Sequence, residues 1–137
     1  MAIMTMSRYE IKYILNKTQA ENFTQMIKNR MEVDEYGLTS IASLYYDTPD
    51  SRLIRKSIEK PEYKEKIRLR SYGLAKENSP LFLELKRKAD GIVYKRRAEM
   101  NQKKVDEFFG GGELKGGQIE KEISYFRSYY KKLVPAC

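Results

Sequence analysis

The residues with the clearest chemical potential in this sequence are basic side chains that recur at every second position. Four segments show this pattern, and two of them include a glutamate. The residues are Arg8, Glu10 and Lys12; Lys64, Lys66, Arg68 and Arg70; Glu84, Lys86 and Lys88; and Lys95 and Arg97. Successive side chains of a β-strand point to opposite faces, so these segments, folded as strands, would present their charges on one face. Such a face carries ten cations and two carboxylates and predicts an anionic ligand.

A solvated sheet face is the ordinary alternative for charged residues at alternate positions. However, like charges opposed across strands destabilise a sheet by about 0.2 to 1 kcal/mol per pair, and a solvated face usually mixes signs. A bound anion would remove this repulsion, so the pattern favours a binding face. The predicted charged face contains one aromatic residue, Phe82, and this scarcity of rings favours recognition of phosphate over stacking of bases.

The two glutamates of the charged set, Glu10 and Glu84, allow two interpretations. Each could simply pair with a neighbouring cation, such as Lys12 or Lys86. Alternatively, each could help to hold Mg²⁺ or Mn²⁺, which prefer carboxylate and phosphate oxygens and bridge phosphates at phosphoryl-transfer sites. Both are therefore candidate metal ligands, and Glu10 is the better one because cations lie two residues away on either side.

The composition excludes most other kinds of site. The 137 residues contain no histidine, and the single cysteine is Cys137, so histidine bases, Ser-His triads, disulfides and Cys-cluster zinc sites are all excluded. The net charge is +8, and residues 52–104 hold 17 basic and 7 acidic side chains. This concentration of charge predicts a polyanionic partner: nucleic acid, an anionic membrane surface or a phosphorylated small molecule. Without a spanning apolar run or a signal peptide, the expected location is the cytoplasm.

The elements that must position these charges follow from periodicity and turn residues. The expected strands cover about 8–14, 41–47, 62–72, 81–89 and 92–99, and the turn at Asp90-Gly91 makes the last three an antiparallel meander. The first expected helix covers about 18–30 and has a capping box of Thr18 and Glu21. A short helix should follow Thr48, with Pro49 as its first residue and Leu53, Ile54 and Ile58 buried. Two more helices are expected, one after Asn101 and one from Ile119 to Leu133. The two longer helices should cover the apolar side of the strands, which carries Tyr9, Ile11, Tyr13, Ile67, Leu69, Leu81, Leu83, Leu85 and Tyr94.

Several segments together resemble the N-terminal part of the VTC domain, the polyphosphate polymerase domain of the vacuolar transporter chaperone type. They are RYEIKY at 8–13, LYYDTPD at 44–50, EKIRLRSYG at 65–73 and LFLELKRKADGIVYKRR at 81–97. The domain belongs to the triphosphate tunnel metalloenzyme group, which also includes the CYTH proteins. The resemblance is close over about residues 7–100.

The resemblance implies an α+β fold, in which an antiparallel sheet forms about half of a triphosphate-tunnel β-barrel with a cationic concave face and helices outside. It implies that Lys12, Arg68, Arg70, Lys86, Lys95 and Arg97 bind phosphate, and Arg8, Lys66 and Lys88 share the same predicted face. It also implies a metal role for Glu10 with Mn²⁺ or Mg²⁺, although Arg8 breaks the Glu-x-Glu-x-Lys signature of related enzymes.

The predicted function is binding of triphosphate, polyphosphate or ATP, with metal-dependent phosphoryl transfer from ATP to a polyphosphate chain. A same-fold triphosphatase or cyclase, or a non-catalytic module that binds polyphosphate or RNA, are the alternatives. No residue is assigned as an acid or base. Five strands are too few to close a tunnel, so residues 1–137 are expected to form a single incomplete domain. On its own this chain is expected to be inactive and to self-associate through a sheet edge.

Overall fold

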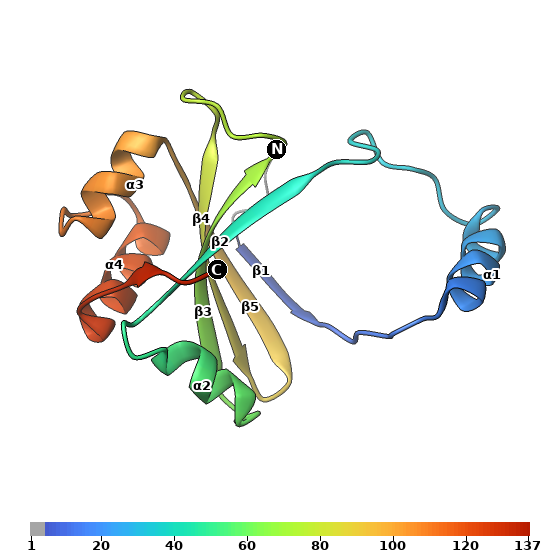
Figure 1. Ribbon diagram of the computed structural model, residues 1–137, viewed down its shortest axis with the longest axis horizontal. Helices are drawn as coiled ribbons and strands as arrows, with labels where there is room; N and C mark the ends of the chain where they lie inside the picture. Colours follow the sequence, from blue (N-terminus) through green and yellow to red (C-terminus); the bar gives the residue numbers. More distant parts are fainter. Residues whose placement is uncertain (1–4) are drawn as a thin grey trace. The chain divides into compact units, whose positions relative to one another are not determined.

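The computed structural model describes residues 5–137, which fall into two units (Figure 1). One unit combines the N-terminal residues up to Tyr9 with Ser40–Cys137 and contains the whole sheet. The other unit, Glu10–Thr39, contains one helix, α1 (Lys17–Ile27). In the described part of the chain, no helix is long and apolar enough to cross a lipid bilayer.

The first unit is built on a six-stranded sheet in which every pair of neighbouring strands is antiparallel. The order across the sheet is β1-β5-β4-β3-β2-β6. The strands are β1 (Thr5–Tyr9), β2 (Ile41–Asp47), β3 (Lys64–Tyr72), β4 (Leu81–Ala89), β5 (Ile92–Met100) and β6 (Val134–Pro135). The predicted α+β class with an antiparallel sheet is confirmed. The sheet is open in the described residues, so closure into a tunnel stays a prediction.

The meander of β3, β4 and β5 forms the centre of the sheet, as predicted. The β4–β5 hairpin turns through Asp90 and Gly91, whose φ angles are 48° and 79°. Two successive positive φ angles are what a type I′ turn requires, and this turn matches the twist of the strands that it joins. The ladder therefore begins directly at the pair Ala89 and Ile92 and fixes the register of both strands.

The hydrophobic core contains residues from one face of this meander and from two helices, α3 (Gln102–Phe109) and α4 (Gln118–Tyr130). Leu83, Leu85 and Ile67 of the strands are fully buried in the same cluster as Phe108 of α3 and Ile123 of α4. Figure 1 shows the two helices side by side. Each fully buried aliphatic side chain contributes about 1.5–3 kcal/mol relative to an exposed one, so this layer supplies much of the stability.

The short helix α2 (Arg52–Ile58) begins later than the sequence predicted. Asp47, which is buried, accepts hydrogen bonds from the backbone N–H groups of Leu53 and Ile54, and the Thr48 hydroxyl accepts one from Arg52 N–H. The side chains of Asp47 and Thr48 thus accept the hydrogen bonds that the first N–H groups of α2 cannot make within the helix. The prediction of Pro49 as the first helical residue was wrong. Leu53 is buried, whereas Ile54 and Ile58 are exposed, contrary to prediction.

The first strand differs most from its prediction of 8–14. β1 ends at Tyr9, which pairs with Ile92, the first residue of β5. Beyond this point β5 offers no backbone groups to continue the ladder, so Glu10 and Lys12 follow the strand instead of belonging to it. In the second unit, α1 is capped by Asn16 and Gln19, not by the predicted Thr18 and Glu21, and it buries no side chain.

The last residues of the chain form the edge of the sheet next to β2. β6 was not predicted, because two residues are too short to show an alternating pattern. It pairs with β2 through Tyr46 opposite Pro135 and Asp47 opposite Val134. Farther along, Tyr45 exchanges backbone hydrogen bonds with Ala136 and Cys137, so the C-terminal residues continue along β2.

Candidate anion-binding site

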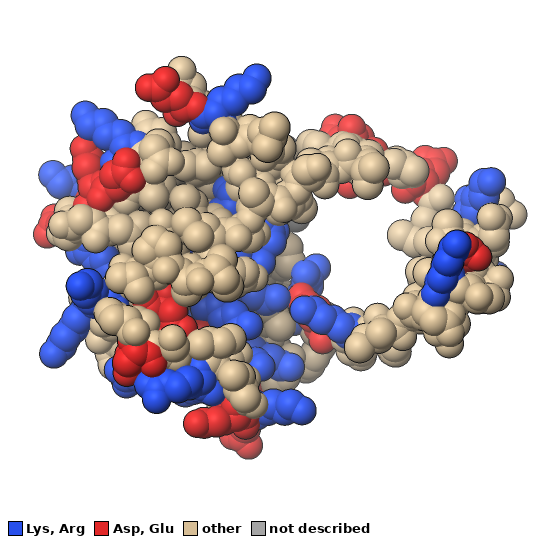
Figure 2. Space-filling view, viewed as in Figure 1, with Lys and Arg blue, Asp and Glu red and all other residues tan. Residues whose placement is uncertain are grey.

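The charged residues of four strands form rows across one face of the sheet. Residues directly opposite each other in paired strands share a face, so the register defines the rows. From β2 or β3 outward, the arginine row is Tyr45, Arg68, Glu84 and Arg97; the lysine row is Lys66, Lys86 and Lys95; and the outer row is Lys64, Lys88, Val93 and Arg8. The register brings these residues to one face of the sheet, whereas Lys12, also predicted for this face, lies outside the strands. Figure 2 shows basic side chains around the position of β3 and β5 in Figure 1.

Glu84 lies at the centre of the arginine row and has no exposed surface. It accepts a hydrogen bond from Nε of Arg68 at 2.7 Å and another from Nε of Arg97 at 2.8 Å. Nζ of Lys95 and Nε of Arg70 lie 3.7 and 3.9 Å from its oxygens. One carboxylate is therefore surrounded by four cations.

The two guanidinium groups of this row also donate hydrogen bonds to tyrosine hydroxyls. Arg68 donates from NH1 to the hydroxyl of Tyr45 at 2.9 Å, and Arg97 donates from NH2 to the hydroxyl of Tyr72 at 2.8 Å. The Arg97 side chain is 7% exposed and that of Arg68 is 15% exposed. Buried charges of this kind persist only where hydrogen bonds replace the lost water, and here the carboxylate and two phenols do so.

The ionisation of these groups reflects the same arrangement. Burial by itself would raise the pKa of Glu84, but the hydrogen bonds from Arg68 and Arg97 outweigh burial, and the pKa lies below its ordinary value. The pKa of Lys95 is lowered, first by burial and then by the repulsion of Arg97 and Arg70, against the attraction of Glu84. The rows of this face thus hold more positive charge than the carboxylate of Glu84 offsets.

The lysine row places three ammonium-bearing residues, Lys66, Lys86 and Lys95, directly opposite one another on adjacent strands. For Lys66, and for Lys64 and Lys88 of the outer row, the described residues show no ion pair with a carboxylate. Opposed like charges cost a sheet about 0.2–1 kcal/mol per pair. Oxyanions bound on this row would relieve that repulsion.

Glu10 and Glu84, the predicted metal ligands, belong to different units of the chain. Both oxygens of Glu84 already accept hydrogen bonds from guanidinium groups, so the groups that donate these bonds are cations of the protein and not further metal ligands. Glu10 belongs to the other unit, where it lies 3.7 Å from Nζ of Lys12. No group of three acidic or cysteine side chains that could hold a metal occurs in residues 5–137. The metal roles of Glu10 and Glu84, and the phosphate role of Lys12, stay predictions.

Two tyrosines on the charged face were missed by the sequence analysis. Tyr45 is opposite Arg68, and Tyr72 follows Arg70 at the strand spacing. Tyr72 packs edge to face on Phe82 at 5.6 Å, and the Arg97 guanidinium lies 4.9 Å from the Phe82 ring centre. The inference that Phe82 is the one aromatic residue here was therefore wrong. Extending the alternation of β3 by one step would have found Tyr72, but finding Tyr45 required the pairing of β2.

Comparison with known proteins identifies the same family that short segments of the sequence resemble. None of the curated proteins compared with this chain matches it. The family model described as VTC domain matches residues 7–135, nearly the whole chain, and this range includes all three rows of the charged face. The chain therefore belongs to the VTC domain family.

Proposed function

We propose that the charged face binds the phosphate groups of triphosphate, polyphosphate or ATP. The observation that carries this proposal is the lysine row, in which Lys66, Lys86 and Lys95 oppose one another beside a second row that includes Lys64 and Lys88. Side chains that repel each other in this way gain most from a ligand with several adjacent negative charges. A linear chain of phosphates supplies that charge at short, regular spacing, and membership of the VTC domain family supports the assignment.

The reaction proposed for a site built on this face is transfer of the terminal phosphoryl group of ATP to the end of a polyphosphate chain. The acceptor oxygen of such a chain is already anionic, so no protein base is needed, consistent with a sequence that lacks histidine. The contribution of the protein is to hold donor and acceptor in line and to offset the charge of the transferred group. The cations proposed for this work are Arg68, Arg70, Lys86, Lys95, Arg97 and Lys12, with Arg8, Lys66 and Lys88 beside them.

Binding is separable from turnover in this chain. The sheet is open along β1 and along the part of β2 that β6 does not cover, so the face is not enclosed within the described residues. Enclosure excludes water and strengthens charge interactions during phosphoryl transfer. We therefore expect the 137-residue chain to bind phosphates with little or no polymerase activity, and to self-associate through an open edge.

A direct test compares ligands by calorimetry at two ionic strengths. Inorganic triphosphate should bind more tightly than a single-stranded oligonucleotide of matched charge, and its affinity should fall as salt rises. Equal or tighter binding of the oligonucleotide would favour the nucleic-acid alternative. In that alternative, bases would have to stack on the rings of Tyr45 and Tyr72. Tyr45 already contacts Arg68, and Tyr72 already contacts Phe82 and Arg97.

A second test asks which cations matter. Arg70→Ala or Lys86→Ala should weaken triphosphate binding by about 1.5–3 kcal/mol, the value of a charge-assisted contact. Lys131→Ala and Lys132→Ala, which remove charges just after α4, are the matched controls and should have little effect. Equal losses in all four variants would indicate a general surface-charge effect and contradict a defined site.

A further inference from the structure

The position of Glu84 raises a question that phosphate binding alone does not answer. A face that binds polyanions contains a fully buried carboxylate at its centre, where its charge would repel the ligand. Four cations contact it or lie within 4 Å, namely Arg68, Arg97, Arg70 and Lys95. Without this carboxylate, those four cations would be packed together with no opposite charge among them.

We propose that Glu84 is a positioning residue that acts as an internal counter-anion, taking the place of a phosphate ligand on Arg68 and Arg97. The inference rests on the proposed function, because it assumes that the face receives phosphate. In the empty protein, Glu84 holds the two guanidinium groups in place. When phosphate binds, Glu84 competes with it for the same donors and keeps its affinity below the value that the cations alone would give.

The chemistry of the groups supports competition. Carboxylate and phosphate are both oxyanions that a guanidinium fork binds in the same way. Arg97 gives Nε and NH2 to Glu84 and shares NH2 with the Tyr72 hydroxyl, while Arg68 gives Nε to Glu84 and NH1 to Tyr45. The two guanidinium groups of this row therefore direct five hydrogen bonds to groups of the protein itself.

The charge along the face differs from row to row. The outer row carries three cations, the lysine row carries three, and the arginine row carries two cations and one carboxylate. Glu84 therefore directs the attraction for phosphate toward the lysine row and the outer row. Replacing it by a neutral group would extend the strong field across all three rows.

Glu84→Gln tests this role because glutamine keeps the size of the side chain and removes its charge. Without ligand, the variant should unfold at a lower temperature, since four cations lose their counter-anion. With inorganic triphosphate, the bound anion should replace the missing carboxylate, so the ligand should raise the Tm of the variant more than that of the wild type. The Kd for triphosphate should fall at least tenfold, and its salt dependence should become steeper because more cations are open to the ligand.

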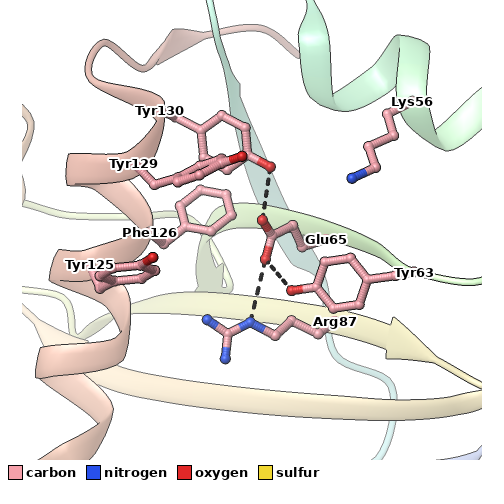
Figure 3. A pocket seen from close by; sticks show the side chains of 8 residues that line it. All are labelled: Lys56, Tyr63, Glu65, Arg87, Tyr125, Phe126, Tyr129 and Tyr130. Carbon is pink, nitrogen blue, oxygen red and sulfur yellow. Dashed lines mark hydrogen bonds and ion pairs between the residues drawn. The ribbon is translucent and has the colours of Figure 1, made fainter.

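A matched control lies on the next strand and the opposite face. Glu65 is also a mostly buried carboxylate, with 10% of its side chain exposed, and it accepts hydrogen bonds from Arg87, Tyr63 and Tyr130 (Figure 3). Glu65→Gln changes the net charge equally and should also lower the Tm. It should leave the Kd for triphosphate and its salt dependence as in the wild type, because Glu65 contacts no cation of the charged face.

The outcomes separate this inference from the proposed function. If the wild type fails to bind triphosphate, the proposed function is wrong, whereas the inference is judged by the difference in Tm shift between Glu84→Gln and wild type. A triphosphate-induced Tm shift in Glu84→Gln no larger than in wild type overturns the inference, and so does an equal gain in affinity in Glu65→Gln. If Glu84→Gln does not fold in dilute buffer, Glu84→Asp is the second test, because the shorter side chain of aspartate should hold the guanidinium groups less well. Glu84→Asp should bind triphosphate more tightly than the wild type does. An affinity equal to that of the wild type would overturn the inference.

Discussion

The two faces of the central sheet each bury a glutamate, and they satisfy it differently. On the helix-covered face, Glu65 of β3 accepts hydrogen bonds from two phenols, Tyr63 and Tyr130, both at 2.8 Å, and from Nε of Arg87 at 3.4 Å (Figure 3). On the charged face, Glu84 of β4 accepts hydrogen bonds from guanidinium groups alone among the described residues. The first carboxylate has one cationic partner, and the second has two with two more cations nearby.

This difference shows which feature supports the proposed binding role of the charged face. Neutral phenols satisfy the lone pairs of Glu65 without adding charge, and Arg87 also pairs with Glu122, which pairs with Arg96. Two carboxylates therefore balance two guanidinium groups, and the helix-covered side is neutral in this cluster. Burial of a carboxylate is common to both faces. Of these two groups of charges, only the one on the charged face has an excess of cations over carboxylates, and this excess supports the proposal of an external anion.

The largest expected difference between the two buried glutamates is in their effect on stability. Arg97→Met should lower the free energy of unfolding by about 3–5 kcal/mol, because it removes a buried partner of Glu84. Arg87→Met is the matched change on the other face and should cost less, since 26% of the Arg87 side chain is exposed and Glu65 keeps two phenols. Urea unfolding of both variants measures the difference. Equal losses would mean that the two carboxylates depend on their cations alike.

Ligand binding should separate the two faces next. Lys66→Ala, in the lysine row, should weaken triphosphate binding by about 1.5–3 kcal/mol. Lys56→Ala removes an equal charge beside the pocket of about 210 Å³ on the helix-covered side, where Nζ of Lys56 lies 5.5 Å from the Tyr63 ring centre. This control should leave the affinity nearly unchanged in calorimetry. A comparable loss in Lys56→Ala would show that phosphate does not distinguish the faces.

A smaller effect tests the phenol donors of Glu65. Tyr130→Phe removes one hydrogen bond from a mostly buried carboxylate and should cost about 1–2 kcal/mol in the free energy of unfolding. Tyr125→Phe on the same helix is the control, because the described residues show no hydrogen bond from its hydroxyl and the residue is exposed. Urea unfolding of the two variants should differ accordingly, and equal stability would contradict the role assigned to the Tyr130 hydroxyl.

The smallest effect is spectroscopic and concerns alkaline pH. Burial and the hydrogen bond to Glu65 raise the pKa of Tyr63 from 10.0 to about 12, and the same two causes raise the pKa of Tyr130. The folded state thus holds these phenol protons more tightly than the unfolded state. Their contribution to stability is fully present below pH 10 and is lost as the pH rises from 10 through about 12. Tyrosinate absorbance should show a late step that Tyr63→Phe reduces, and an unchanged titration would contradict it.

The sequence was sufficient for several features that neighbouring residues decide, although not for the caps of α1 and α2. The alternation in β3, β4 and β5, the Asp90-Gly91 turn and the Asn101 cap of α3 all depend on residues close in the chain, and each was predicted within two residues. The same local alternation predicted which cations share a side within each of these strands. The family membership was also evident in short segments of the sequence.

Only the tertiary structure decided what depends on distant partners. β1 was predicted to run past Glu10, but a strand extends only as far as its partner supplies backbone groups, and β5 begins at Ile92. Tyr45 reached the charged face through the pairing of β2 with β3, which local patterns do not specify. Parity placed Glu84 among cations, but the registers of β3 and β5 on either side of β4 determine that Arg68 and Arg97 take its oxygens. A hydrogen bond is set by distances of tenths of an ångström between strands, and the sequence of one strand does not contain them.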